Sequence, residues 1–100
     1  MAMFGTVARM RAKPGMESKL EELSRQFESR HVDGWLSTTI YRAKENPNEF
    51  WLSVVFRDEA SYTKNAGDPV QDRWFREMMQ MLESEPEWHD GDVVHAAHTH

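Results

Sequence analysis

Two runs of β-branched and aromatic residues, separated by a polar cluster, dominate the middle of the chain. The runs span residues 35–41 and 50–56, and the turn-forming cluster ENPNE at residues 45–49 separates them. Because such side chains suit a pleated, half-buried surface, the pattern predicts a β-hairpin. Alternation along the second run gives one uninterrupted apolar row, which we expect to be fully buried: Phe50, Leu52, Val54 and Phe56.

The chain before the hairpin is predicted to supply one strand and one helix. Residues 3–11 alternate loosely between an apolar and a mixed face, which is typical of a strand, and Lys13-Pro14-Gly15 ends it. In the next segment apolar residues recur at helical spacing and predict a helix with one core-facing stripe: Met16, Leu20, Leu23 and Phe27.

Two capping signals predict two helices after the hairpin. Asp58 precedes a short helix over residues 59–65, which Gly67 ends. Asp68 followed by Pro69 indicates a longer helix from about residue 69 to 83, and residues 92–97 are predicted to form the last strand. The order β, α, β, β, α, β is that of a ferredoxin-like α+β fold, in which helices cover one face of a four-stranded antiparallel sheet.

Large side chains lie on both faces of the predicted hairpin. Trp35 and Tyr41 alternate with Leu36 and Ile40, and Trp51 lies in the mixed row of the second strand. Helices on one side of the sheet would leave the other aromatic face in water. We therefore expect a second covering, most simply a second copy of the chain in a homodimer, with Trp35, Tyr41 and Trp51 at the interface.

Composition limits the class of protein. One hundred residues suffice for a single domain, over residues 1–100, and 39% hydrophobic with 29% charged residues is typical of a soluble globular chain. A net charge of -5 argues against a nucleic-acid partner, because phosphate binding needs a basic face. No apolar run approaches the ~20 residues of a membrane span and no secretory signal is visible, so we expect a cytoplasmic protein without a membrane partner.

The chain lacks Cys and ends in a His-rich segment, residues 95–100. Imidazoles bind zinc, copper and nickel, but His95 and His98 would point to opposite faces of a continuing strand. A terminal tail also lacks the surrounding groups that orient metal ligands. We expect no metal site here, and disorder of residues 95–100 is the alternative to a continuing strand.

Several short phrases, in this order and spacing, resemble the antibiotic biosynthesis monooxygenase (ABM) family over almost the whole chain: Pro14-Gly15, Gly34-Trp35-Leu36-Ser37, Glu49-Phe50, the segment RDEASY at residues 57–62, and Asp68-Pro69. The resemblance implies a dimeric α+β barrel, in which the sheets of two ferredoxin-like subunits pack together. It also implies a ligand cavity between the sheet and the helices of each subunit.

The best-understood enzymes of this family oxidise polyphenols to quinones with molecular oxygen and without flavin, haem or metal. Their functional Asn, Trp, Tyr and Arg fall on Leu52, Phe56, Tyr62 and Arg76 of this chain. The resemblance thus implies that Tyr62 and Arg76 orient a substrate oxyanion. Leu52 and Phe56 lack the polar groups of the family pattern and leave only an apolar contact with substrate.

The resemblance therefore predicts a cofactor-independent monooxygenase, an oxidoreductase acting on a small aromatic or polyketide-like substrate. A haem-degrading branch of the family is not matched, since its axial His, its Asn and its Trp fall on Phe75, Ala8 and Asn65. We expect no cofactor. The alternative is a non-catalytic, small-ligand-binding or stress-associated dimer of the same fold, which Leu52 and Phe56 favour.

Other candidate substrate contacts follow from the helical patterns. Trp74 and Met78 lie on a wide apolar helix face and suit a flat aromatic ligand, although at this spacing such residues are more often core. Phe27 lies on the first helix stripe, and His31 continues that stripe as a candidate base.

Tyr62, Arg76 and His31 could each instead have a purely structural role, without contact to a substrate. The ring of Tyr62 would pack under the hairpin and Arg76 would pair with Asp72. His31 would favourably interact with the carboxyl end of the first helix.

Overall fold

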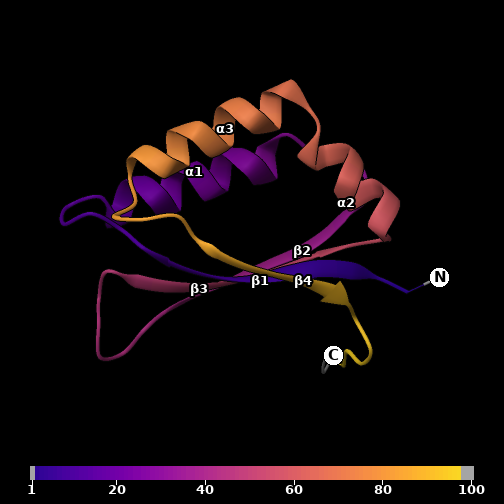
Figure 1. The fold of residues 1–100 in the computed structure, drawn as a ribbon, viewed down its shortest axis with the longest axis horizontal. Helices are drawn as coiled ribbons and strands as arrows, with labels where there is room; N and C mark the ends of the chain where they lie inside the picture. Colours follow the sequence, from indigo (N-terminus) through magenta and orange to yellow (C-terminus); the bar gives the residue numbers. More distant parts are fainter. Residues whose placement is uncertain (1, 98–100) are drawn as a thin grey trace.

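A computed structural model describes residues 2–97 of the chain. Figure 1 shows three helices above a twisted sheet of four strands. The elements are β1 (Phe4–Arg11), α1 (Glu17–Ser29), β2 (Trp35–Arg42), β3 (Glu49–Phe56), α2 (Glu59–Ala66), α3 (Pro69–Gln80) and β4 (Glu87–Asp92). The predicted α+β class, with a four-stranded antiparallel sheet of ferredoxin-like topology, is confirmed.

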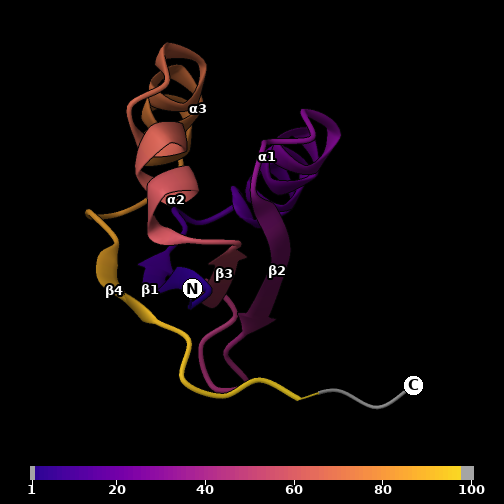
Figure 2. The same cartoon turned by 90° about the vertical axis from the view of Figure 1, so that its right-hand side faces the viewer.

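The strands lie in the order β2-β3-β1-β4, and every pair is antiparallel. Figure 2 shows α1 and α3 on the same side of this sheet, whereas no helix covers its other side among residues 2–97. We call these the helix face and the outer face. Strand register assigns Thr6, Ala8 and Met10 of β1 to the helix face, because they pair with the apolar row of β3.

The core lies between the helix face and the helices. Its buried members come from the sheet, from α1 and α3, and from the segments that follow β1 and α3: Ala8, Met10, Ala12, Leu20, Leu23, Phe50, Met78 and Leu82. Burial of such side chains contributes about 1.5–3 kcal/mol each for the large ones, so this cluster is the main source of stability.

Both capping predictions are confirmed. The Asp58 side chain accepts a hydrogen bond from the Ser61 amide at 2.8 Å, and α2 begins directly after it. The Asp68 side chain accepts from the Val70 amide at 2.7 Å, with Pro69 as the first residue of α3. These contacts satisfy amide groups that a helix start leaves without partners.

The end of the chain differs from the prediction. The last strand is Glu87–Asp92, not residues 92–97, and Val94 is 95% exposed. The segment EWHDGD has little β propensity, but it pairs along β1, where the backbone of β1 would otherwise lack partners. Helix α3 ends at Gln80 instead of residue 83, because the chain turns there and the Glu83 amide donates to the Arg11 carbonyl at 2.9 Å.

Residues 95–97 have no helix or strand assignment, and the remaining His98 and His100 lie outside the described residues. The prediction of disorder for residues 95–100 therefore stays a prediction.

The first strand of the hairpin contains an irregularity that the alternation pattern misplaces. A register shift between Trp35 and Ser37 pairs Trp35 with Phe56 on the helix face, and its ring lies 5.6 Å from that of Phe27. Trp35 therefore does not belong to the outer face, contrary to prediction, because one extra residue in a strand turns the following alternation over. Leu36 is exposed at this bulge.

The apolar row of β3 is only partly buried. Phe50 and Phe56 are buried, as predicted, but Leu52 and Val54 between them are half-buried. The expectation of full burial is wrong for these two residues, because they border a cavity.

Candidate functional site

A cavity of about 400 Å³ lies between the helix face and the helices. Its walls are mostly apolar and include Phe27, Ile40, Leu52, Phe56, Trp74 and Met78. Cavities of this size and character are the usual binding sites for small organic molecules.

Short side chains in the sheet explain the position of the cavity. Val54 of β3 pairs with Thr6 on one side and Thr38 on the other, so one row across the sheet carries only small, β-branched residues. The larger Phe50 and Phe56 occupy β3 on either side of this row. Since the helices rest on the larger side chains, space remains above Thr6, Val54 and Thr38, and all three line the cavity.

The helix wall of the cavity is held by Trp74. Its Nε1 donates to the Leu23 carbonyl of α1 at 2.9 Å, and its ring lies 5.6 Å from that of Phe27. The indole N–H is therefore satisfied within the protein, and its flat face remains available to an aromatic ligand.

Tyr62 of α2 provides a polar group at one end of the cavity. Its ring lies between Phe4 and Phe56, at 5.1 and 5.5 Å between ring centroids, and its hydroxyl donates to Asp90 Oδ1 at 3.1 Å. Burial and the Asp90 carboxylate together raise the pKa of Tyr62 to about 12, and a hydrogen bond from the Thr6 hydroxyl opposes this shift in part. Near neutral pH the phenol therefore stays protonated and cannot act as a phenolate base.

Arg76 and His31 lie away from these residues. The Arg76 side chain is 77% exposed and pairs with Asp72 at 3.0 Å, one helical turn away. His31 follows the end of α1 with a positive φ of 50°, and it lines a separate, polar depression with Arg30 and Lys64. The other candidates are brought together around the cavity: Phe27, Leu52, Phe56, Tyr62, Trp74 and Met78.

Two residues of the site were absent from the sequence-based candidates. Asp90 was missed because the last strand was predicted over residues 92–97, which left Asp90 in a loop. Thr6 was missed because it was treated as one member of an alternating strand. Its polarity on the otherwise apolar face of β1 was the available signal, since Ala8 and Met10 are its neighbours there.

The charged residues that line the cavity are both acidic. Glu21 pairs with Arg42 at 3.1 Å, whereas Asp90 receives only the Tyr62 hydroxyl among the hydrogen bonds and ion pairs of residues 2–97. Within that described part, the lining contains no Lys, Arg or His. The cavity thus offers no ion pair to an anionic ligand.

Metal sites and membrane-spanning helices were the two other features sought in residues 2–97. No cluster of three or more His, Asp or Glu side chains suited to a metal ion occurs in residues 2–97. None of the helices in this range is both long and apolar enough to span a membrane.

The fold and the cavity define an α+β domain with a largely apolar cavity between its sheet and its helices. Comparison with protein families then gives a particular assignment. The chain belongs to the antibiotic biosynthesis monooxygenase family, whose model matches residues 3–77, so the resemblance inferred from sequence is confirmed. No curated protein matches the chain.

Solved structures support the same fold. A protein assigned to the antibiotic biosynthesis monooxygenases from Chloroflexus aurantiacus J-10-fl is 21% identical, with a TM-score of 0.82 and coverage of 97% of this chain and 98% of its own. SnoaB, a cofactor-independent oxygenase from Streptomyces nogalater, was solved as a mutant and is 12% identical, with a TM-score of 0.83 and coverage of 96% and 97%. A conserved protein from Methanosarcina mazei Go1 is 20% identical, with a TM-score of 0.79 and coverage of 91% and 92%.

Proposed function

We propose that this protein binds a small aromatic or polyketide-like molecule in the cavity and oxidises it with molecular oxygen, without a cofactor. The observation that carries the proposal is the apolar cavity of about 400 Å³ between helices and sheet, in a chain of the monooxygenase family. The substrate supplies the electrons in this scheme. The chain binds it, excludes water and orients its oxygenated ring.

Each wall of the cavity has a separate task in this proposal. Trp74 and Phe27 hold one face of a flat ligand, while Leu52 and Phe56 contact the other through the sheet. Tyr62 orients an oxygen atom of the substrate at the polar end. Arg76 takes no part, because its pair with Asp72 and its exposure keep it outside the cavity.

Oxygen consumption tests this proposal directly. The purified protein is incubated with a panel of hydroxylated anthrones and quinols in an oxygen electrode. Tyr62→Phe is expected to lower kcat/KM about tenfold or more, the effect of losing one hydrogen bond, whereas Tyr41→Phe on the outer face leaves it unchanged. An absence of oxygen uptake with every member of the panel would contradict the enzymatic proposal.

A second candidate is a non-catalytic protein, such as a stress-associated one, that binds a small ligand in the same cavity. It is favoured by Leu52 and Phe56, whose apolar side chains cannot hydrogen-bond to a reactive oxygen intermediate. Quenching of tryptophan fluorescence by an anthrone, with no oxygen consumed, would select this candidate. Uptake coupled to binding would exclude it.

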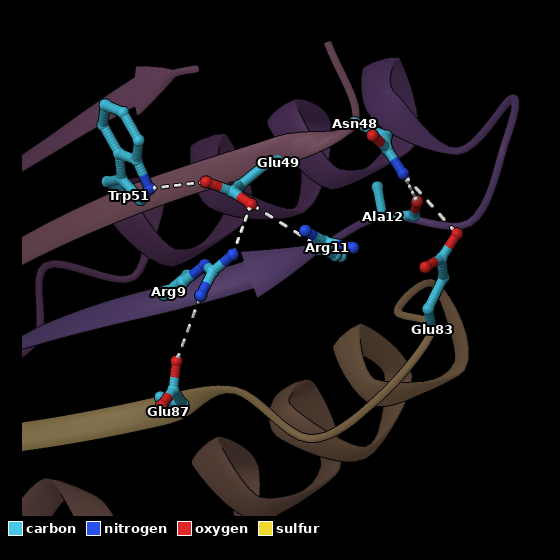
Figure 3. Close-up of polar contacts among 8 residues, drawn as sticks. All are labelled: Arg9, Arg11, Ala12, Asn48, Glu49, Trp51, Glu83 and Glu87. Carbon is cyan, nitrogen blue, oxygen red and sulfur yellow. Dashed lines mark hydrogen bonds and ion pairs between the residues drawn. The ribbon is translucent and has the colours of Figure 1, made fainter. Parts of the chain in front are cut away.

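We further propose that the outer face packs against a second copy of the chain. Val7, Tyr41 and Trp51 are 56%, 61% and 45% exposed there, more apolar surface than a sheet in water usually carries. Figure 3 shows that the charges on this face are already paired within the chain: Glu49 bonds Arg9 and Arg11, and Arg9 also reaches Glu87.

Internal pairing of this kind suits an identical partner. A two-fold interface brings the same patch of both copies together, so unpaired like charges would repel. Light scattering at micromolar concentration is expected to give the mass of a dimer, and a monomer would contradict this proposal.

A further inference from the structure

We propose that a polar depression beside the cavity binds the carboxylate group of a ligand whose apolar part occupies the cavity. The inference rests on the proposed function, because it assumes that the cavity is the binding site. It adds the class of ligand, an apolar molecule with a carboxylate at one end, and it assigns Arg30 as the residue that recognises this group.

The depression adjoins the cavity where the ends of the helices meet. Its volume is about 310 Å³, and its lining comes from the segment after α1, from α2 and from the start of α3. Figure 1 shows these three parts of the chain close together. Asn65 of α2 lines both spaces, so the depression and the cavity share a wall.

Arg30 lies at the boundary between the two spaces. Its guanidinium carbon is 5.1 Å from the centroid of the Phe27 ring, and its Nη2 donates to Gln71 Oε1. Phe27 and Gln71 line the cavity, whereas Arg30 lines the depression. The Nε atom of Arg30 is buried without a partner among residues 2–97, so a ligand would meet the Nη atoms instead.

The charge of Arg30 is not compensated within the described part of the chain. Its side-chain hydrogen bond goes to a neutral amide, and no ion pair of residues 2–97 includes Arg30 or Lys64. The acidic groups of the depression are engaged, since Asp33 pairs with Arg57 at 3.6 Å and Asp68 accepts a first-turn amide of α3 at 2.7 Å. A half-buried cation without a carboxylate partner favours an incoming anion.

A second arginine beside the cavity differs in this respect. The Arg42 guanidinium lies 5.8 Å from the centroid of the Phe50 ring, which also lines the cavity. However, Arg42 pairs with Glu21 at 3.1 Å, so its charge is neutralised within the chain. The position over an aromatic ring is therefore common to both arginines, and the missing carboxylate distinguishes Arg30.

The two spaces together select a ligand with distinct ends. The cavity lining of residues 2–97 contains no Lys, Arg or His, so a carboxylate gains no ion pair inside it. At the boundary, the planar guanidinium of Arg30 offers N–H groups that match a carboxylate. Lys64 of α2 adds a second positive charge to the depression.

Three probes that differ only at one end test this assignment: 3-(2-naphthyl)propanoate, 3-(2-naphthyl)propan-1-ol and 3-(2-naphthyl)propylamine. Their binding is measured by calorimetry near neutral pH and at low salt. We expect the propanoate to bind about tenfold tighter than the alcohol, the effect of a charge-assisted hydrogen bond, and the amine to bind most weakly. Salt at about 0.5 M should reduce this preference, because the depression is open to solvent.

Substitutions locate the effect. Arg30→Met removes the charge but keeps an unbranched chain over Phe27, and it should lower the preference for the propanoate over the alcohol to about threefold or less. Arg25→Met is the matched control on the same helix. Arg25 pairs with Glu22 and lines neither space, so this variant should keep the preference. Circular dichroism checks the fold of each variant.

The outcomes are distinct for the two levels of the proposal. Equal binding of the propanoate and the alcohol by the native chain would overturn the carboxylate subsite but leave cavity binding intact. A preference that survives Arg30→Met, or that Arg25→Met reduces equally, would overturn the assignment to Arg30. Binding of none of the three probes would contradict both the subsite and the cavity as a binding site.

Discussion

Polar side chains make many hydrogen bonds on the outer face of the sheet and few on the helix face. On the outer face, the Glu49 carboxylate accepts from Arg9 at 2.9 Å, Arg11 at 3.3 Å and the Trp51 indole at 3.0 Å, so it is fully engaged (Figure 3). On the helix face, the Asp90 carboxylate borders the cavity and accepts, among residues 2–97, only from the Tyr62 hydroxyl at 3.1 Å. Both sets of residues come from β1, β3 and their neighbours.

The two faces therefore suit different kinds of contact. A polar group that already makes all its hydrogen bonds gains little from a new partner molecule, so the outer face is suited to packing against a rigid surface. A group with unused bonding capacity gains a bond when a ligand arrives. The number of bonds that a polar side chain already makes therefore distinguishes the two faces of this sheet.

The largest expected effect is the difference in stability lost when a large side chain is truncated on each face of the sheet. Phe50→Ala removes a fully buried side chain from the helix face and is expected to lower the free energy of unfolding by about 3–5 kcal/mol. Trp51→Ala, the next residue on the outer face, should cost much less at concentrations where the chain is monomeric. Urea denaturation measures both, and equal losses would contradict the assignment of the two faces.

The outer face is probed next by charge insertion. Val7→Lys places a like charge on the outer face of each copy, within the proposed interface, and is expected to convert a dimer to a monomer. Val70→Lys is the matched control, since Val70 is 44% exposed on α3, away from the sheet. Light scattering gives both masses. A dimer that survives Val7→Lys would place the interface elsewhere.

A smaller effect should appear in the pH dependence of stability. The hydrogen bond from Arg9, with the charges of its surroundings, lowers the pKa of Glu49 below its ordinary value of about 4.3. A carboxyl group with a lowered pKa stabilises the folded state above that ordinary value, and this contribution is lost as pH falls through the lowered pKa.

Glu49→Gln is therefore expected to lower the urea midpoint near neutral pH and to match the native chain in acid. Glu22→Gln, on an exposed ion pair with Arg25, serves as the control and should change little at either pH. A difference between native and Glu49→Gln chains that persists unchanged in strong acid would contradict this account.

The smallest expected effect is a shift in the ultraviolet titration of Tyr62, which lines the cavity. Because its pKa is raised to about 12, Tyr62 should ionise late in an ultraviolet titration, and the difference from Tyr62→Phe isolates its signal. Asp90→Asn should move this pKa downward, since it removes the negative charge and weakens the acceptor. An unchanged titration in Asp90→Asn would show that burial alone sets the pKa.

Much of the fold could be predicted because local signals agreed with the global arrangement. The caps at Asp58 and Asp68 and the stripe from Leu20 to Phe27 all depend on neighbours within one or two helical turns. The last strand could not be predicted in this way. Its residues are polar, and only the long-range pairing with β1 makes Glu87–Asp92 a strand.

The site was predictable only in its apolar part. Trp74, Met78, Leu52 and Phe56 follow from helical or strand periodicity and lie around the cavity. The Thr6–Asp90 pair depends on strand register across β1 and β4, which no local pattern contains. Arg76 matched a family position, yet its side chain is directed to Asp72 on its own helix.

The bulge between Trp35 and Ser37 has a consequence for descent within the family. Loss of the single residue Leu36 would leave Trp35 opposite Phe56 and Ser37 opposite Val55, which is regular antiparallel pairing. Trp35 would stay beside Phe27, and only the exposed Leu36 side chain would be lost. Relatives with one residue fewer at this point are therefore expected to keep an aromatic ring against the first helix.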